Sequence, residues 1–234
     1  MICPPLLHIE ALTAGHGKQD VLDDVSLSVA PGTTACVLGP AGAGKTTLLM
    51  TVAGLLRGKS GSIRFAGEEI RRKRANEIVA RGIAYVPHNR LLCRNLSVRD
   101  NLLAAVWREP DRSRVEADAT QLFARFPRLK ALATQRASTL SSGEQQLLGI
   151  ARALMSRPSL LLIDEPIAGL PPEIVDDIVE LVEQLNRQDI SVLIAEKRDN
   201  GHKVLRAAKY AYLLEEGRIA FAGEAKALRA RAVA

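Results

Sequence analysis

The chain has 234 residues, of which 47% are hydrophobic and 25% are charged, a composition typical of a folded globular protein and not of a disordered or fibrous one. Its three cysteines (Cys3, Cys36 and Cys93) are odd in number and far apart, which indicates neither a disulfide framework nor a zinc cluster and is consistent with a reducing cytosol. The formal net charge of +6 permits an anionic partner, whereas no apolar run reaches the roughly 20 residues that span a bilayer, and residues 1–10 lack the pattern of a signal peptide.

Short apolar or alternating segments predict strands in the first third of the chain. We place these strands at residues 9–14, 22–29, 34–38, 62–65 and 83–86. The first two alternate apolar with polar side chains, as antiparallel strands with one buried face do. A glycine-rich segment after the third leads into a helix predicted over residues 46–56. We interpret the basic run RRKR at residues 71–74 as a solvated helix face, because no aromatic side chains interleave with it to stack on nucleic acid bases.

The middle of the chain has helical periodicity. Leucine and alanine recur every three or four residues in three segments, which lie at residues 98–106, 115–126 and 144–155. Strand signals then return at residues 160–163, 192–195 and 210–214, with a helix over residues 172–186 and a hairpin turn at residues 215–218. Alternation of strands and helices on both sides of a helical stretch predicts a parallel α/β core with a helical insertion.

Residues 39–46 (GPAGAGKT) fit the spacing of a phosphate-binding loop and lie between a predicted strand and a predicted helix. Glycines let backbone N–H groups surround an anion, and the start of the following helix adds a positive dipole end. In this pattern Lys45 supplies a charge to the β- and γ-phosphates, and the Thr46 hydroxyl can ligate Mg²⁺. The residues expected around the nucleotide are Gly39, Pro40, Ala41, Gly42, Ala43, Gly44, Lys45 and Thr46.

Two carboxylates follow the apolar strand at residues 160–163. The continuous aliphatic run predicts a strand covered on both faces, so Asp164 would lie at the carboxyl edge of the sheet, where α/β proteins bind ligands. Asp164 can hold Mg²⁺, and Glu165 can polarise an attacking water. An acidic turn without function is the competing interpretation, and the phosphate loop upstream favours the functional one.

Residues 141–144 (SSGE) form a capping box ahead of an apolar stripe of helical spacing. The cap supplies hydrogen-bond partners at the start of the helix. The same start is also a site for an anion, because the first N–H groups lack partners within the helix. The residues alone do not decide between a well-capped helix and a nucleotide contact.

The ordered set GPAGAGKTT, LSSGEQQ and LLLIDEP resembles the ATP-binding subunit of ABC transporters. The resemblance implies a P-loop NTPase core with an N-terminal antiparallel β subdomain and a helical insertion. It implies one domain over residues 1–234, with the core at 1–88 and 158–234 and the insertion at 89–157. It also implies a head-to-tail dimer, in which Ser141, Ser142, Gly143 and Glu144 would face ATP held by a partner. Thr47 would join the phosphate loop at the chain's own ATP.

Further segments, among them GIAYVPHNR, NLSVRDNLL and YLLEEGRIAFAG, resemble branched-chain amino acid importers. The proline-ended loop GLPP at residues 169–172 is similar to that of the shorter of their two ATPase subunits, with urea or amide importers as a related alternative. The resemblance implies a peripheral subunit on the cytoplasmic face of the inner membrane. Its implied partners are a second, different ATPase subunit, two integral membrane permease subunits and, indirectly, a periplasmic solute-binding protein, with no nucleic acid.

Four residues depart from the family pattern at positions that the resemblance assigns to the nucleotide. His16 stands where an aromatic residue stacks on adenine, and His88 stands where a glutamine contacts Mg²⁺ and water. Ser142 replaces a glycine of the signature, and Lys197 replaces the switch histidine. Lys197 could contact the γ-phosphate but cannot act as a base while protonated. With Glu165 and Lys45, His88 and Lys197 are the expected catalytic residues.

Three functions follow. The first is an ATPase that energises import through a separate permease. The second is a weakly hydrolysing or non-hydrolysing subunit that completes the ATP site of a different partner, which His88 and Lys197 favour and the Asp164-Glu165 pair disfavours. The third, a soluble ABC ATPase acting on nucleic acid or ribosomes, fits poorly because such proteins usually join two ATPase units in one chain.

Overall fold

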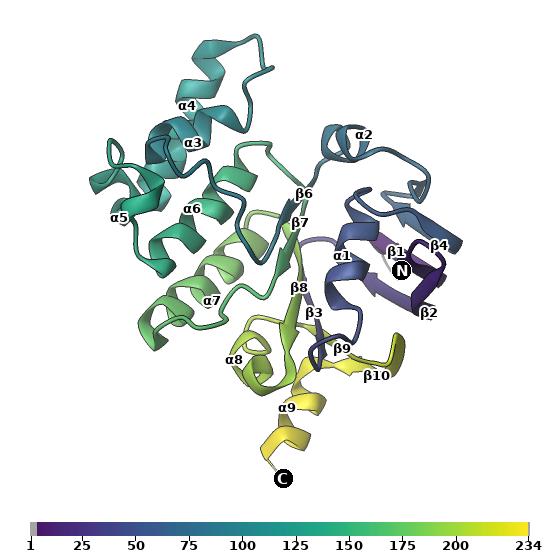
Figure 1. Ribbon diagram of the computed structural model, residues 1–234. Helices are drawn as coiled ribbons and strands as arrows, with labels where there is room; N and C mark the ends of the chain where they lie inside the picture. Colours follow the sequence, from purple (N-terminus) through teal and green to yellow (C-terminus); the bar gives the residue numbers. More distant parts are fainter. Residues whose placement is uncertain (1–3, 234) are drawn as a thin grey trace.

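The computed structural model describes residues 4–233 and contains two β-sheets (Figure 1). Cys3 lies outside the described residues. The four-stranded sheet is antiparallel and has the order β2 (Gln19–Val29), β1 (Leu7–His16), β4 (Gly58–Phe65) and β5 (Glu68–Glu69). The six-stranded sheet has the order β10 (Arg218–Glu224), β9 (Tyr210–Glu215), β3 (Thr34–Gly39), β8 (Ser191–Lys197), β7 (Leu160–Asp164) and β6 (Ile83–Val86).

All neighbouring strands of the six-stranded sheet are parallel except the hairpin β9–β10. Strands β3 and β7 are buried throughout, which explains why β7 is a continuous aliphatic run in the sequence. The register pairs Gly39 with Lys197 and Asp164 with Ala195, so the carboxyl ends of β3, β7 and β8 meet at one edge. This edge carries the candidate functional residues.

Nine α-helices and two 3₁₀ helices are present within residues 4–233. The α-helices are α1 (Lys45–Val52), α2 (Ala75–Ala80), α3 (Val98–Ala104), α4 (Arg112–Arg125), α5 (Pro127–Ala131), α6 (Ser142–Leu154), α7 (Pro172–Asn186), α8 (Gly201–Val204) and α9 (Ala225–Val233), and the 3₁₀ helices are η1 (Ala137–Thr139) and η2 (Arg198–Asn200). None of the helices in this part of the chain combines the length and the apolar character needed to cross a membrane.

Two apolar cores lie on opposite faces of the six-stranded sheet. On one face, Leu162 and Leu193 pack with Leu48 of α1 and with the antiparallel sheet. On the other face, Leu161 and Ile194 pack with α6 and α7, and the core continues into α3, α4 and α5. Figure 1 shows α1 and the four-stranded sheet on one side of β6–β8, and α3 to α7 on the other. The phosphate loop and α6 are therefore separated by the sheet within one chain.

The structure confirms the predicted strands and the helix at Pro172–Asn186, and it corrects two expectations. The first helix ends at Val52 and not at residue 56, because the chain turns at Gly54 with φ 69°. The basic run at residues 71–74 is not a helix face but a turn that precedes α2. Arg71 donates from its guanidinium to the carbonyl oxygens of Gly58 and Lys59, so part of this run fastens the turn to β4.

Candidate active site

The phosphate loop joins β3 to α1 and needs glycine at two positions. Gly42 has φ 80° and Gly44 has φ 106°, in the left-handed region that side chains disfavour. A Cβ atom on Gly44 would also lie 2.7 Å from Leu22 Cδ2 of β2. The loop therefore has a conformation that its sequence specifies locally, with Pro40, Ala41 and Gly42 exposed to solvent and Gly39 and Ala43 buried.

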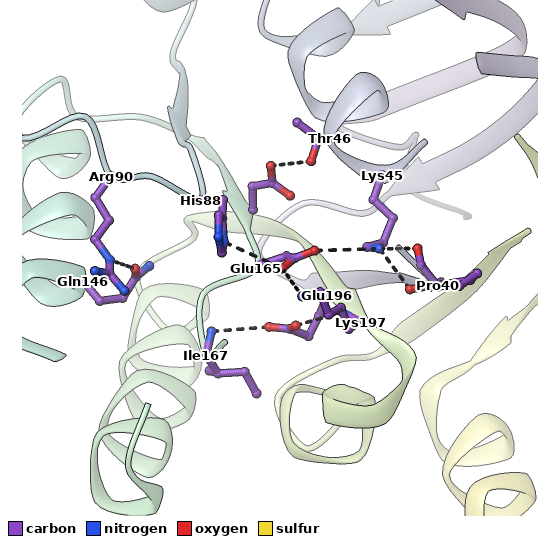
Figure 2. Close-up of polar contacts among 12 residues, drawn as sticks. Pro40, Lys45, Thr46, His88, Arg90, Gln146, Glu165, Ile167, Glu196 and Lys197 are labelled. Atoms are coloured by element: carbon purple, nitrogen blue, oxygen red, sulfur yellow. Dashed lines mark hydrogen bonds and ion pairs between the residues drawn. The ribbon is translucent and has the colours of Figure 1, made fainter. Parts of the chain in front are cut away.

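Lys45 curls back over this loop (Figure 2). Its side chain is almost fully buried, and Nζ donates to the carbonyl oxygens of Gly39 at 2.9 Å and Pro40 at 2.8 Å. Burial lowers the pKa of Lys45, whereas the nearby carboxylates of Glu165 and Asp164 favour its charged form. The ammonium is thus held at the loop where phosphates would bind. Thr47, the next residue but one, is also buried, inside the first turn of α1.

Asp164, at the end of β7, forms a small polar group with Thr46 and Tyr85. Its Oδ2 atom accepts hydrogen bonds from Thr46 Oγ1 at 2.8 Å and from the Tyr85 hydroxyl at 3.3 Å. Its Oδ1 atom is buried and has no hydrogen-bond partner in the protein. Burial raises the pKa of Asp164, and the hydrogen bond from Thr46 opposes that shift.

These atoms fit a magnesium ion that is held together with a nucleotide. Mg²⁺ in such sites takes one or two protein oxygen ligands, and phosphates and water supply the others. Thr46 and Asp164 provide a hydroxyl and a carboxylate with one unpartnered oxygen. Among residues 4–233, no group of three or more His, Cys, Asp or Glu side chains is arranged to hold a metal. Mg²⁺ at Thr46 and Asp164 would therefore need the ligands from phosphate and water.

Glu165 is surrounded by three nitrogen atoms that come from three different segments (Figure 2). Lys197 Nζ lies 3.3 Å and His88 Nδ1 lies 3.7 Å from Oε2, and Lys45 Nζ lies 4.0 Å from Oε1. The Glu165 side chain is 14% exposed, so it is sheltered but can be reached by water. The structure thus brings together the four residues expected to be catalytic, and it places them beside Asp164.

The backbone at Glu165 has φ 45°, which is unfavourable for a residue with a side chain. The turn follows directly after β7, and the Glu165 N–H donates to the Ala195 carbonyl of β8 at 2.8 Å. From this strained turn the carboxylate lies between Lys45 on one oxygen and Lys197 and His88 on the other (Figure 2).

The signature residues lie at the start of α6, away from the chain's own phosphate loop. Ser141 is the N-cap: its Oγ accepts from the Glu144 N–H at 3.3 Å, and the Glu144 carboxylate accepts from the Ser141 N–H at 2.8 Å. Ser141 and Ser142 are exposed, whereas Gly143 is buried against α7. His16 is also apart from the Glu165 group, at the exposed end of β1.

Sequence reasoning missed three polar residues near this site. Tyr85 lies in an apolar strand, and only the pairing of β6 with β7 brings its hydroxyl to Asp164. Glu196 is fully buried at the end of β8, where a charge directly after the apolar run was the available signal. Arg90, two residues after His88, donates to Gln146 of α6 at 2.8 Å, a contact for which the sequence had no signal.

A phosphate loop at the carboxyl edge of a parallel sheet, followed by an Asp-Glu pair, defines a P-loop nucleotide-binding protein. A family model described as ABC transporter matches residues 22–168. The chain belongs to the ABC transporter family and is an ATPase subunit of a transporter.

Named relatives agree with this assignment. The chain is 42% identical to the high-affinity branched-chain amino acid transport ATP-binding protein BraG of Pseudomonas aeruginosa, over 92% of this chain and 91% of that protein. It is 34% identical to a probable branched-chain amino acid transport ATP-binding protein, LivF, of Archaeoglobus fulgidus, over 95% and 94% of the two chains. A crystal structure of the ADP conformation of an ABC transporter cassette superposes with a TM-score of 0.83 at 29% identity, over 97% of this chain and 95% of that one.

Proposed function

We propose that this chain hydrolyses ATP to energise the import of a small solute through a separate membrane permease, with branched-chain amino acids as the expected class. The observation that carries the chemistry is the convergence of Lys45, His88 and Lys197 on Glu165, next to the Thr46–Asp164 pair. The solute class is supported by the 42% identity to BraG, whose name states its transport role.

In this proposal the loop at residues 39–47 holds the phosphates of ATP, and Lys45 supplies the charge nearest to them. Thr46 and Asp164 would hold Mg²⁺, which would neutralise phosphate charge when bound. Glu165 orients a water molecule and accepts its proton. Its carboxylate suits this role of general base because it is sheltered but within reach of solvent. Lys197 and His88 approach Oε2 of Glu165, whereas Lys45 approaches Oε1, and in this proposal Lys197 and His88 would both stabilise charge on the γ-phosphate.

The proposed assembly follows from the separation of the phosphate loop and α6. Ser141, Ser142, Gly143 and Glu144 would meet ATP on a second ATPase subunit, expected to be a different chain, and His16 would contact adenine. Residues 89–101, at the start of the proposed helical insertion (89–157), would transmit the motion to two permease subunits. Leu91 and Leu96 in this stretch are 60% and 40% exposed, as suits a protein contact. The subunit would then be peripheral to the cytoplasmic face of the inner membrane, with a periplasmic solute-binding protein as an indirect partner.

Reconstitution in lipid vesicles tests the proposal. The complete complex should hydrolyse ATP faster when leucine, isoleucine or valine is supplied with the solute-binding protein, and it should accumulate the solute inside oriented vesicles. The same complex with Lys45→Ala is the matched control for ATP dependence. Stimulation by urea or amides alone would move the assignment to the related importers, and outward transport would contradict import.

The Lys197–Glu165 pair also favours a second candidate, a weakly hydrolysing subunit that completes the site of a different ATPase. The Lys197 ammonium lies 3.3 Å from Glu165 Oε2, so this ion pair would restrain the carboxylate and compete with the attacking water for it. Under this candidate the purified chain binds ATP but turns over slowly until it is paired. Comparing the turnover of the isolated chain with that of the assembled complex decides between the two candidates. Rapid turnover by the isolated chain would exclude the second candidate.

A further inference from the structure

Glu196 is a fully buried carboxylate to which the proposed chemistry assigns no role. It is the last residue but one of β8, and side chains along a strand alternate between the two faces of the sheet. Val192 and Ile194 belong to the core on the α6 and α7 side, so Glu196 points to that side, beneath the loop that follows Glu165. A buried charge is costly unless hydrogen bonds satisfy it, so its partners indicate its role.

The backbone partners of Glu196 lie in the loop after β7 and at the end of β8 (Figure 2). Its Oε2 atom accepts from the backbone N–H of Ile167 at 3.3 Å, and its Oε1 atom accepts from the backbone N–H of Lys197 at 2.8 Å. The side chain of Asn200 also hydrogen-bonds to it. Burial raises the pKa of Glu196, and these hydrogen bonds oppose the shift. One carboxylate thus joins the loop after β7 to the end of β8.

Each of these two segments carries a residue of the candidate active site. Ile167 lies two residues after Glu165, whose φ of 45° is unfavourable for a residue with a side chain and persists only where its surroundings impose it. Lys197 carries the ammonium that contacts Glu165 Oε2. On the strand side the turn is held by the Glu165 N–H bond to Ala195, and on the loop side it is held by Glu196.

We infer that Glu196 is a positioning residue for ATP hydrolysis: its carboxylate holds the strained turn at Glu165 and the backbone of Lys197 in fixed relation. The inference rests on the proposed function. Glu196 touches neither the nucleotide nor the attacking water, and it acts through the placement of the Glu165 carboxylate.

Glu196→Gln is the principal test. The amide keeps the size of the side chain but replaces one acceptor oxygen with a donor, so either Ile167 or Lys197 faces an N–H group in place of an acceptor. We expect kcat of the assembled complex to fall roughly tenfold, while ATP affinity changes less than twofold, because the phosphate loop is untouched. Glu196→Asp retains both acceptor oxygens and should recover part of the loss; it also serves if Glu196→Gln fails to fold.

A matched control separates positioning from general destabilisation. Ser191 is fully buried at the opposite end of β8, and its Oγ accepts from the Gly32 N–H at 2.9 Å. Ser191→Ala should lower the melting temperature but leave kcat unchanged. In a Glu165→Gln background, Glu196→Gln should cause no further loss, because the carboxylate that it positions is already absent. An equal proportional loss in both backgrounds, or an unchanged kcat in Glu196→Gln, would overturn the inference.

Hydrogen exchange supplies a readout that does not depend on turnover. In the nucleotide-free chain, peptides covering residues 165–171 and 196–200 should exchange faster in Glu196→Gln than in the wild type, whereas Ser191→Ala should leave them unchanged. Unchanged exchange in Glu196→Gln would contradict the proposed link between the loop after β7 and the end of β8. If the wild-type complex hydrolysed no ATP, the proposed function would fail. The exchange result would still decide whether Glu196 holds the loop after β7 and the end of β8 together.

Discussion

Glu165 is the residue on which the other side chains of the site converge. Its carboxylate is approached by Lys45, His88 and Lys197, and its backbone is held in a strained turn by β8. Asp164, the preceding residue, is directed instead toward Thr46 and Tyr85. Two adjacent carboxylates thus have different surroundings, which allows one to bind a metal ion and the other to accept a proton.

Replacing Lys45 with alanine removes the ammonium held at the phosphate loop. We expect ATP affinity to fall at least tenfold and hydrolysis to fall to background, as measured by titration with a fluorescent ATP analogue and by phosphate release. Lys130→Ala, on exposed α5, is the control and should change neither quantity. Wild-type affinity in Lys45→Ala would remove this lysine from the nucleotide site.

Glu165→Gln keeps the shape of the side chain but removes its basicity. ATP binding should stay within about twofold of the wild type, and hydrolysis should fall roughly 10²-fold or more, in line with the usual effect of losing a general base. Single-turnover measurements with bound ATP isolate this step. Undiminished turnover would mean that another group activates the water.

Lys197→Gln separates the two candidate functions. If the Lys197 ammonium stabilises charge on the γ-phosphate, turnover should fall several-fold with little change in ATP affinity. The measurement is kcat of the assembled complex at saturating ATP. A rise in turnover would show instead that the 3.3 Å pair with Glu165 restrains the carboxylate, which is the behaviour of the weakly hydrolysing candidate.

At the scale of elements, α6 is fixed at its start by a capping box and by close contact with α7. A Cβ atom on Gly143 would lie 2.8 Å from Ile174 Cγ1, so the first turn of α6 sits directly on α7. Farther along the same helix, a Cβ atom on Gly149 would meet its nearest neighbour, Arg90 Cβ, at 3.6 Å, which is ordinary contact. Packing against α7 therefore leaves no room for a side chain at Gly143, whereas Gly149 has room for a methyl group.

This difference gives a paired prediction for stability. Gly143→Ala should destabilise the chain by about 1–3 kcal/mol through overpacking against α7. Gly149→Ala, at a helical position with room for a methyl group, should be neutral or stabilising by up to about 1 kcal/mol. Urea denaturation followed by circular dichroism measures both. Adding Ile174→Ala to Gly143→Ala should relieve the clash, and equal effects of the two glycine substitutions would refute the steric explanation.

At the scale of the whole molecule, the six-stranded sheet separates α1 and the phosphate loop from α6. The proposed contact between the signature residues and ATP therefore requires a second chain. The same sheet connects the two sides, because the strands that end at Asp164 and Lys197 also form the surface on which α7 packs.

The expected dependence on a second chain is measurable by dilution. The specific ATPase activity of the paired ATPase subunits should fall as they are diluted below their dissociation constant, because each site is completed by its partner. Phosphate release per chain over a hundredfold range of protein concentration gives the curve, with light scattering to follow the molar mass. A specific activity that stays constant while the mass falls to that of one chain would contradict the shared site.

Much of the fold could be predicted because its signals are local. The aliphatic run of β7, the glycines of the phosphate loop and the periodicity of α7 each specify a conformation from consecutive residues. Prediction failed where a tertiary contact ends or replaces an element. α1 ends at Val52, before the turn at Gly54, where a Cβ atom would lie 2.6 Å from Ile78 Cδ1, and the basic run at residues 71–74 is a turn fastened to β4.

The sequence by itself determined the family, the phosphate loop, the Asp164-Glu165 pair and the capped start of α6, because each depends on residues a few positions apart. Only the tertiary structure decided which distant groups meet Glu165. The strand order β3-β8-β7-β6 brings Lys45, Lys197 and His88 to one edge, and the alternation of side chains along β8 sends Lys197 to Glu165 and Glu196 beneath its loop. Contacts across strands depend on order and register, which no local stretch of residues encodes.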